Sequence, residues 1–293
     1  MKLNVKDYVS ERKEMLKEKI RSTFRSDEKL KLIVLSNTSN ERTLAYMRNK
    51  VKVGAELGIE VKVIDLKDSS QLRRIMMQNA GEVPTILQLP CKDSQMEKVY
   101  QKLNEQYKTD IDGFFHYENI YKGKLWDIIP ATPKGIMIFI AHQKMGKRIR
   151  VDKYDNLIGN VVIFGRGELI GKPLSILMLK HCKSLQIMTS SSTEEERIQA
   201  FKNADTIILA TGKDNYLNKK YIEGNTKSKL IIDTGIFMGD NGKLHGELYP
   251  ILPFIENDEN IKYTPVPSGV GLLTTWSLFE NVYDFYFNKL KGE

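Results

Sequence analysis

Apolar residues recur along the first third of the chain in two spacings, and each spacing predicts its own kind of element. In some stretches they return every three or four positions, as on one face of a helix. In others they form short runs bounded by polar residues or glycine, as in buried strands. The predicted helices cover about 7–24, 41–57, 70–79 and 94–106, and the predicted strands cover 30–35, 59–66 and 85–89. Thr38, Ser39 and Asn40 offer an N-cap to the second helix, and Gly58 ends it.

The same alternation returns after residue 130. Pro130 and Pro133 mark a loop, and a helix over about 135–147 follows. The later strands are predicted over 160–164, 184–188, 206–210 and 229–234, and the later helices over 173–181, 194–203 and 272–290. Strands that alternate with helices favour mainly parallel sheets, whose ligands bind at the carboxyl ends of the strands. The predicted fold class is therefore α/β, with two domains.

The last predicted helix carries more apolar surface than a helix can leave in water, with Trp276, Phe279 and Val282 among its residues. We therefore expect it to pack back on the first domain. The predicted domains are an N-terminal α/β substrate domain over 1–130, completed by 272–293, and a Rossmann-like dinucleotide-binding domain over 131–271. A length of 293 residues agrees with two domains of about 100 to 200 residues each.

The composition narrows the class of protein. With 41% hydrophobic and 28% charged residues, the chain is neither disordered nor of low complexity. Cys91 and Cys182 are too few for a disulfide framework or a cysteine zinc site, so we expect no metal and a reducing compartment. The N-terminus lacks the apolar segment of a secretory signal, and no uncharged apolar run reaches the roughly 18 residues of a membrane span. We expect a cytoplasmic protein without a membrane partner.

The formal net charge of +8 could attract nucleic acid, acidic lipid or an anionic small molecule. Lysines and arginines are scattered among acidic residues, and the sequence holds no RNP aromatic motif, zinc-finger spacing or basic stripe. Most of the charge is therefore interpreted as solvated surface. We expect no nucleic-acid partner. Of the molecules that the positive charge could attract, an anionic metabolite is favoured.

A glycine-rich turn follows the strand over 160–164. Its residues Gly165, Arg166, Gly167 and Gly171 have the spacing G-x-G-x-x-x-G, one residue longer than the common dinucleotide fingerprint. By itself the motif fits a plain tight turn as well as a phosphate site. Because it lies between a predicted strand and a helix near Pro173, whose N-terminal end favours anions, the context favours a dinucleotide site.

The next strand ends in Thr189, Ser190, Ser191, Ser192 and Thr193, where an NAD-binding protein usually places an acidic residue for the ribose. Hydroxyl groups beside an arginine could instead accept a ribose 2′-phosphate, which favours NADP over NAD. The structural alternative is that these residues cap the following helix. Both interpretations can hold together.

Three polar residues share one face of the helix over 41–57. Thr43, Tyr46 and Lys50 lie at i, i+3 and i+7, along the edge of a buried stripe. An amine that is half covered at a cleft edge is less hydrated than one in water, and its pKa is lowered. Most helix lysines are solvated surface charges, so the spacing alone does not single out Lys50.

Further candidates lie at the ends of strands and in loops. Gln88 and Leu89 lie at the carboxyl end of a predicted buried strand, and Asp112 lies in a turn with Gly113. Ligands bind at such strand ends, although an Asp-Gly pair is also an ordinary turn. Residues 264–271 contain two prolines and two glycines, a stiff loop whose amides could hold a planar ligand or serve as a loop only.

Taken in order, these segments resemble the bifunctional methylenetetrahydrofolate dehydrogenase/methenyltetrahydrofolate cyclohydrolase family over about Leu32 to Tyr283. The tyrosine-to-lysine helix motif of that family is similar to residues 46–50, its substrate strand to 87–90 and its folate turn to 112–114. Its interdomain motif is similar to 130–135, its dinucleotide turn to 165–173 and its late glycine-rich loop to 265–271. Agreement of six ordered segments by chance is improbable.

The resemblance implies hydride transfer from 5,10-methylenetetrahydrofolate to NADP, then hydrolysis of the methenyl product to 10-formyltetrahydrofolate. It gives Lys50 the role of the catalytic amine, Gln88 that of orienting it, Tyr46 that of stacking on folate, and Asp112 that of binding the pterin. The other substrate-binding positions that it implies are Thr43, Leu89, Pro265, Gly269 and Val270. The implied NADP-binding positions are Gly165, Arg166, Gly167, Gly171, Ser190, Ser191 and Ile236. A homodimer is implied by the family alone.

Several positions depart from the usual family pattern. Gly167 replaces Ser, Ala131 replaces Cys, Ser268 replaces Gly and Leu272 replaces Pro, and residues 190–193 lack the usual basic residue. The departures touch the cofactor site more than the folate residues, so they leave the choice between NADP and NAD open. The alternative hypotheses are a relative with cyclohydrolase activity only, a folate binder without catalysis, an RNA-touching basic domain, and an unrelated NADP-dependent Rossmann dehydrogenase.

Overall fold

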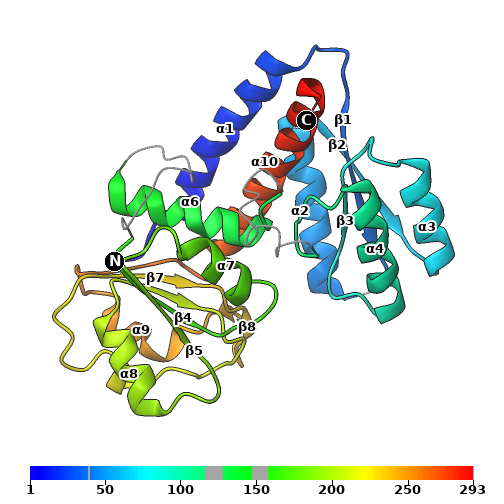
Figure 1. The fold of residues 1–293 in the computed structure, drawn as a ribbon. Helices are drawn as coiled ribbons and strands as arrows, with labels where there is room; N and C mark the ends of the chain where they lie inside the picture. The colour runs from blue at the N-terminus through cyan, green and yellow to red at the C-terminus, as the bar shows by residue number, and fades with distance from the viewer. Residues whose placement is uncertain (39, 116–127, 147–157, 293) are drawn as a thin grey trace. The chain divides into compact units, whose positions relative to one another are not determined.

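The computed structural model describes residues 1–38, 40–115, 128–146 and 158–292, which form two compact units (Figure 1). Of these residues, unit 1 contains 1–10, 132–146 and 158–277. Unit 2 contains 11–38, 40–115, 128–131 and 278–292. The predicted α/β class with two domains is confirmed. No helix in the described parts of the chain combines the length and apolar character needed to cross a membrane.

Unit 2 is built on a three-stranded parallel sheet of order β2-β1-β3. Its strands are β1 (Leu30–Ser36), β2 (Ile59–Asp65) and β3 (Thr85–Leu87). Leu30 pairs with Ile59, and Val34 pairs with Ile86. All but one residue of β1 are buried, as expected for a central strand covered on both faces. The carboxyl ends of all three strands therefore meet at one edge of the sheet.

Helices cover both faces of this sheet. Residues of α1 (Val5–Thr23), α2 (Glu41–Leu57) and α10 (Val270–Lys291) form one apolar core with Leu32 and Val34 of β1. Helices α3 (Ser69–Gln78) and α4 (Ser94–Tyr107) form the other core with Ile33 and Leu35. The residues of α10 in the first core include Leu278, Phe279 and Val282, so the last helix packs into the first domain as predicted.

Unit 1 holds a five-stranded parallel sheet of order β10-β7-β6-β4-β5. Its strands are β4 (Asn160–Phe164), β5 (Ser184–Met188), β6 (Thr206–Leu209), β7 (Lys229–Asp233) and β10 (Ile261–Tyr263). Because β5 and β6 lie on opposite sides of β4, the sheet has a topological switch point between β4 and β6. In open α/β sheets, ligands bind at the carboxyl ends of the strands beside such a point.

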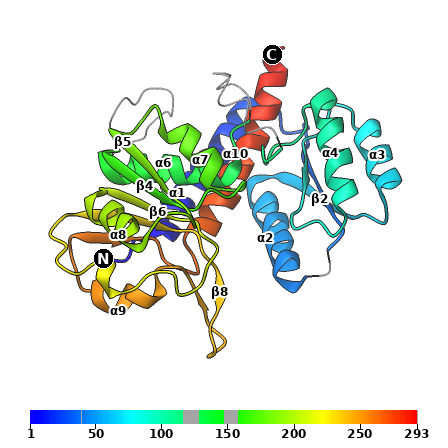
Figure 2. The same cartoon turned by 60° about the horizontal axis from the view of Figure 1, so that its bottom comes forward.

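Two layers of helices enclose this sheet (Figure 1). Helices α6 (Ala131–Met145) and α7 (Gly171–Met178) pack on the face that carries Val161 and Ile163 of β4, and α8 (Glu194–Asn203) and α9 (Leu252–Ile255) pack on the face of Val162 and Phe164. The short 3₁₀ helices are η2 (Lys219–Tyr221) and η3 (Tyr249–Ile251). An antiparallel hairpin of β8 (Phe237–Met238) and β9 (Leu244–His245) extends away from the sheet (Figure 2).

The structure corrects several expected bounds. Pro133 lies within α6, whose first residue is Ala131, because proline is tolerated in the first turn of a helix. The strand predicted over 85–89 ends at Leu87, since Gln88 and Leu89 lead into a cis bond at Pro90. The hairpin, β10 and the short helices were not predicted, because they are too short to show periodicity. Ser39 and Lys147, which the predictions included, lie outside the described residues.

The units also differ from the predicted domain ranges at both ends of the chain. Residues 1–10 and 272–277 belong to unit 1, although they were expected in the first domain. The Leu3 amide donates to the Tyr263 carbonyl at 2.9 Å, and the ring of Tyr8 lies edge-on to that of Phe139 with 5.1 Å between centroids. These contacts join residues distant in sequence, which no local pattern reveals.

Candidate active site

The Lys50 ammonium in unit 2 is buried and bound to one amide side chain. Lys50 is 8% exposed, and its Nζ donates to Oε1 of Gln88 at 2.6 Å. Gln88 directly follows β3, and its Nε2 donates to the carbonyl of Leu89 at 2.9 Å, which turns Oε1 toward the lysine. Helix α2 and the end of β3 therefore bring together two residues that lie 38 positions apart.

Asp112 acts electrostatically on the same ammonium. Burial lowers the pKa of Lys50 below its ordinary value, and the Asp112 carboxylate opposes that shift. Burial raises the pKa of Asp112, while Lys50 and the amide of Ala131 oppose the change. Lys50 and Gln88 are therefore in contact, and the charge of Asp112 acts on the same ammonium.

The turn that carries Asp112 is fixed by its backbone. Gly113 has a φ of +69°, and a Cβ there would lie 2.8 Å from the carbonyl oxygen of Ile128. The Ala131 amide donates to the Asp112 carbonyl at 3.1 Å. Glycine is thus required at position 113 for both its conformation and its close packing.

Asp110 is a further carboxyl in this region that was not predicted. It is 5% exposed, and it accepts hydrogen bonds from the Asp112 amide at 3.2 Å and the Tyr100 hydroxyl at 3.4 Å. Burial, assisted by the charge of Asp112, raises the pKa of Asp110 to about 7. Its place two residues before Asp112 was the available signal, but a sequence does not show which member of an Asp-x-Asp pair is buried.

The remaining predicted residues of unit 2 differ in exposure. Tyr46, one helical turn before Lys50, is 42% exposed, so its ring is available to a ligand. Thr43 is buried, and its amide donates to Oδ1 of Asn40 at 3.3 Å in the first turn of α2. Leu89 is half-buried beside Gln88. An exposed ring beside a buried amine is suited to a flat ligand that carries a reactive group near one end.

In unit 1 two glycines allow close backbone packing at the switch point. Gly165 follows β4 with a φ of +106°, and a Cβ there would lie 2.1 Å from the carbonyl oxygen of Ala210, after β6. A Cβ at Gly171, the first residue of α7, would lie 2.3 Å from the carbonyl oxygen of Gly165. The turn can therefore adopt its path only with glycine at both positions. No such requirement applies to Gly167, where a Cβ would meet open space.

The side chains predicted to bind the cofactor follow the carboxyl ends of β4, β5 and β7. Arg166, Ser190 and Ser191 are exposed, and Ile236 is 38% exposed. The predicted capping role belongs to Thr193, whose hydroxyl and Glu196 form a capping box at the start of α8. A glycine cradle, a helix N-terminus and exposed cationic and hydroxyl groups fit a dinucleotide that carries phosphates.

Two buried acids that were not predicted hold the neighbouring loops. Glu247 accepts hydrogen bonds from the Thr211 hydroxyl at 2.6 Å and the Gly212 amide at 2.9 Å. Asp233 accepts from the amides of Gly235, Glu247 and Leu248 at 2.8 to 3.0 Å. Burial raises the pKa of Asp233 to about 6. Glu247 lies 36 positions from Thr211, so no local motif connects them.

The late loop of unit 1 contains the last three predicted substrate positions. Pro265, Gly269 and Val270 are buried, and a Cβ at Gly269 would lie 2.2 Å from the carbonyl oxygen of Pro265. Ser268 is exposed and has a φ of +75°, a conformation that favours glycine. The substitution of serine for the usual glycine therefore falls at a strained position.

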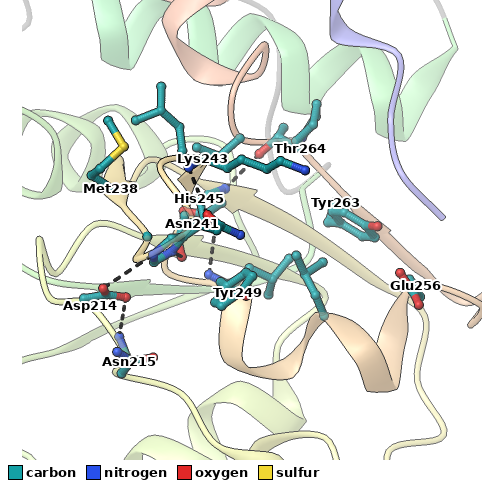
Figure 3. Close-up of a pocket in the computed structure, with 18 of the residues that line it drawn as sticks. Asp214, Asn215, Met238, Asn241, Lys243, His245, Tyr249, Glu256, Tyr263 and Thr264 are labelled. Carbon is teal, nitrogen blue, oxygen red and sulfur yellow. Dashed lines mark hydrogen bonds and ion pairs between the residues drawn. The ribbon is translucent and has the colours of Figure 1, made fainter. Parts of the chain in front are cut away.

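A pocket of about 710 Å³ lies elsewhere in unit 1, beside the β8–β9 hairpin (Figure 3). Its wall includes His245, whose Nε2 lies 3.5 Å from Oδ2 of Asp214 and whose ring lies 4.5 Å from that of Tyr249. Of the predicted site residues only Pro265 lines it. Within the described parts of the chain, no group of three or more histidines, cysteines, aspartates or glutamates could hold a metal.

Known proteins resemble this chain over most of its length. The sequence model described as tetrahydrofolate dehydrogenase/cyclohydrolase, NAD(P)-binding domain, matches residues 130–290. The bifunctional protein FolD of Staphylococcus aureus (strain JH9) is 30% identical over 265 residues, which cover 86% of this chain and 84% of that protein.

Solved structures share the fold. The bifunctional enzyme FolD, methylenetetrahydrofolate dehydrogenase/cyclohydrolase, from Campylobacter jejuni superposes with a TM-score of 0.81 at 23% identity, covering 99% of each chain. The Trypanosoma brucei methylenetetrahydrofolate dehydrogenase-cyclohydrolase, complexed with NADP cofactor and inhibitor, superposes with a TM-score of 0.79 at 17% identity, covering 99% of this chain and 98% of that one.

Proposed function

The chain belongs to the tetrahydrofolate dehydrogenase/cyclohydrolase family, and from this premise we propose that it oxidises 5,10-methylenetetrahydrofolate with NADP and hydrolyses the methenyl product to 10-formyltetrahydrofolate. The observation that carries the proposal is the buried Lys50 ammonium, bonded to Gln88 at 2.6 Å and acted on by Asp112. A folate binder without catalysis has no need of a buried, poorly hydrated amine.

Lys50 performs the proton transfers of the hydrolysis. Water adds to the methenyl carbon, and the neutral amine accepts the proton that the water loses. The resulting ammonium returns that proton to N5 as the bond between this nitrogen and the carbon breaks. The hydroxyl group of the adduct releases its own proton to water in the same step, which leaves the formyl group on N10. A lysine can exchange protons near neutral pH only if its pKa is lowered, and burial does so here. Gln88 keeps the amine in one orientation through its side-chain oxygen.

Asp112 and Tyr46 hold the substrate in this proposal. The Asp112 carboxylate accepts paired hydrogen bonds from the pterin ring, a charge-assisted match that selects folates. The exposed ring of Tyr46 stacks on the planar part of the substrate. Thr43, Leu89, Pro265, Gly269 and Val270 complete the set of substrate contacts proposed for the two units.

Gly165, Gly167, Gly171, Arg166, Ser190, Ser191 and Ile236 form the proposed cofactor site. When bound, NADP supplies the hydride acceptor, and the protein contributes its placement. The exposed guanidinium of Arg166 and the hydroxyl groups of Ser190 and Ser191 suit a ribose 2′-phosphate, which supports NADP over NAD. Residues 190–193 lack the basic residue that is usual in the family, and in this proposal Arg166 supplies the positive charge for the 2′-phosphate instead.

The assembly and location of the protein belong to the same proposal. We propose a homodimer in the cytoplasm. Family membership supports the dimer, and the scarcity of cysteine supports a reducing compartment.

An absorbance assay with methylenetetrahydrofolate and either NADP or NAD tests both activities. We expect oxidation with NADP, followed by disappearance of the methenyl product. Lys50→Met should lower hydrolysis by about 10²- to 10⁴-fold, the usual contribution of a general acid–base group. Tetrahydrofolate binding, measured by calorimetry, should persist. The matched control is Lys52→Met, which removes an exposed lysine from the same helix and should change neither activity. Hydrolysis at the wild-type rate in Lys50→Met would refute the role of Lys50.

A further inference from the structure

A buried amide of the last helix is bound to the backbone of the Asp112 turn. Asn281 is 1% exposed, and its Nδ2 donates to the carbonyl oxygen of Ile111 and to that of Ile129, at 2.8 Å each. Ile111 immediately precedes Asp112. The two carbonyl oxygens accept hydrogen bonds from the same side-chain nitrogen, so one side chain fixes two separate segments of unit 2.

The two segments that Asn281 joins also contact each other. The Ala131 amide donates to the Asp112 carbonyl at 3.1 Å, and Gly113 packs so closely on Ile128 that a Cβ would lie 2.8 Å from its carbonyl oxygen. The turn and residues 128–131 therefore form one backbone assembly. Asn281 binds both segments of this assembly, one of them at the carbonyl group of Ile111, the residue that directly precedes Asp112.

Packing alone does not account for an asparagine at this place. Leu278, Phe279 and Val282 of the same helix are buried in the apolar core of unit 2 and hold the helix rigidly. A leucine of similar size at position 281 would suit such surroundings, whereas a buried amide is costly unless its donors are bonded. The amide is explained by the two carbonyl groups that it satisfies and by the position that it gives to the turn.

We propose, on the basis of the function proposed above, that Asn281 is a positioning residue that holds the Asp112 turn where Asp112 meets both the folate and Lys50. Asn281 does not touch the substrate. It acts through Asp112, whose carboxylate influences the Lys50 ammonium. Loss of the amide lets the turn shift, which weakens folate binding and alters the acidity of Lys50 together.

The test compares Asn281→Leu with Leu278→Ala in the wild-type background of the full chain. Asn281→Leu keeps the volume and removes both donated bonds. Leu278→Ala destabilises the same helix but keeps both hydrogen bonds of Asn281. We expect Asn281→Leu to raise KM for methylenetetrahydrofolate by about 10-fold or more, because small misplacement of a binding group is costly. We expect KM for NADP to be unchanged, since the cofactor residues lie in unit 1. The pH profile of hydrolysis should shift in Asn281→Leu and stay unchanged in Leu278→Ala.

A purely structural role predicts a different result. In that case both variants would lower the folded fraction and leave KM for folate and the pH profile as in the wild type, which would overturn the proposal. If Asn281→Leu does not fold, Asn281→Ser, which keeps one donor, gives the same comparison. Asn281→Gln, which keeps the amide, should recover most of the folate affinity. A wild-type chain with neither activity would remove the proposed function and this inference together, whereas an active wild type with an unaffected Asn281→Leu would remove the inference only.

Discussion

Among the described residues each unit buries one lysine, and the two ammonium groups have different surroundings. Lys229 in β7 is 3% exposed, and its Nζ donates to the carbonyl oxygens of Phe201, Lys202 and Ala204 at 2.8 to 3.0 Å. These carbonyls end α8, where a cation is favoured by the helix dipole. In contrast, among the described residues Lys50 donates only to Gln88. All three donors of Lys229 are used, so its charge stabilises the fold, while Lys50 retains donors for a ligand.

The same contrast extends to the rest of each unit. The candidate chemistry of unit 2 consists of buried side chains that meet across elements, and that of unit 1 consists of backbone at a glycine turn surrounded by exposed side chains. Burial of Lys229 lowers its pKa to about 8, which leaves it charged at neutral pH. Burial alone therefore does not identify a reactive lysine; the number of its hydrogen-bond acceptors does.

The largest effect on activity is expected from a substitution that disrupts the glycine turn of unit 1. Gly165→Ala places a Cβ 2.1 Å from the Ala210 carbonyl oxygen at a positive φ, so the backbone must move. We expect oxidation of methylenetetrahydrofolate to fall by about 100-fold or more, which corresponds to roughly 3 kcal/mol of lost transition-state binding. Hydrolysis of added methenyltetrahydrofolate should remain near the wild-type rate, because Lys50, Gln88 and Asp112, the residues proposed for this step, lie in unit 2. Gly167→Ala, whose Cβ meets open space, is the matched control within the same turn and should reduce oxidation far less than Gly165→Ala does. Equal losses in the two variants would contradict this account of the turn.

The second prediction separates the two buried lysines by stability. Lys229→Met leaves three carbonyl groups at the end of α8 without a donor, and we expect it to lower the free energy of unfolding by about 2–4 kcal/mol. Lys50→Met removes one bond, and Asp112, whose pKa is already raised by burial, can take up a proton when its cation is lost. We therefore expect a change within about 1 kcal/mol. Urea unfolding followed by circular dichroism measures both. If Lys50→Met proves the more destabilising variant, Lys50 has a structural role that the hydrogen bonds do not show.

Much of the fold could be predicted because its signals are local. The predicted bounds 41–57, 160–164, 184–188 and 194–203 coincide with the observed α2, β4, β5 and α8. In these segments the apolar period and the caps point to the same element, as Gly58 does with its φ of +77° after α2. The predicted bounds were wrong where a residue fits two kinds of structure. Pro133, for example, fits either a loop or the first turn of a helix, and it lies in the first turn of α6.

The site divides in the same way. The glycine turn was visible in the sequence because its residues are consecutive. Lys50, Gln88 and Asp112 became prominent only through the resemblance of ordered segments to a family, since each alone fits a surface lysine, a strand end or a turn. Asp110, Asn281 and Glu247 were missed because most of their partners are backbone groups, which carry no residue-specific signal. Hydrogen bonds to distant backbone are invisible in any sequence pattern.

The third prediction uses pH to distinguish the acids of the two units. Burial raises the pKa of Asp110 in unit 2 to about 7 and that of Asp233 in unit 1 to about 6. An acid with a raised folded pKa contributes stability below its unfolded pKa, near 3.8, and that contribution is lost as the pH rises through the folded value. Wild-type stability should therefore decline from pH 4 to pH 7. Asp110→Asn should reduce the decline by on the order of 1–3 kcal/mol, measured by urea unfolding across this range. A decline of unchanged size in this variant would mean that Asp110 does not titrate there.

The smallest expected effect concerns two strained positions, one in each unit. Ser268 in the late loop of unit 1 and Lys108 at the end of α4 in unit 2 have φ values of +75° and +53°, in the left-handed region that glycine adopts without strain. Relief of that strain exceeds the added freedom of the unfolded chain, so Ser268→Gly and Lys108→Gly should each stabilise the protein by about 0.5–1 kcal/mol. Thermal unfolding measures this gain. Because only Ser268 lies in a loop proposed to contact substrate, only Ser268→Gly should also change KM for folate. An unchanged KM in Ser268→Gly would mean that the loop only joins β10 to α10. A changed KM in Lys108→Gly would mean that relief of strain alters KM without any contact with substrate.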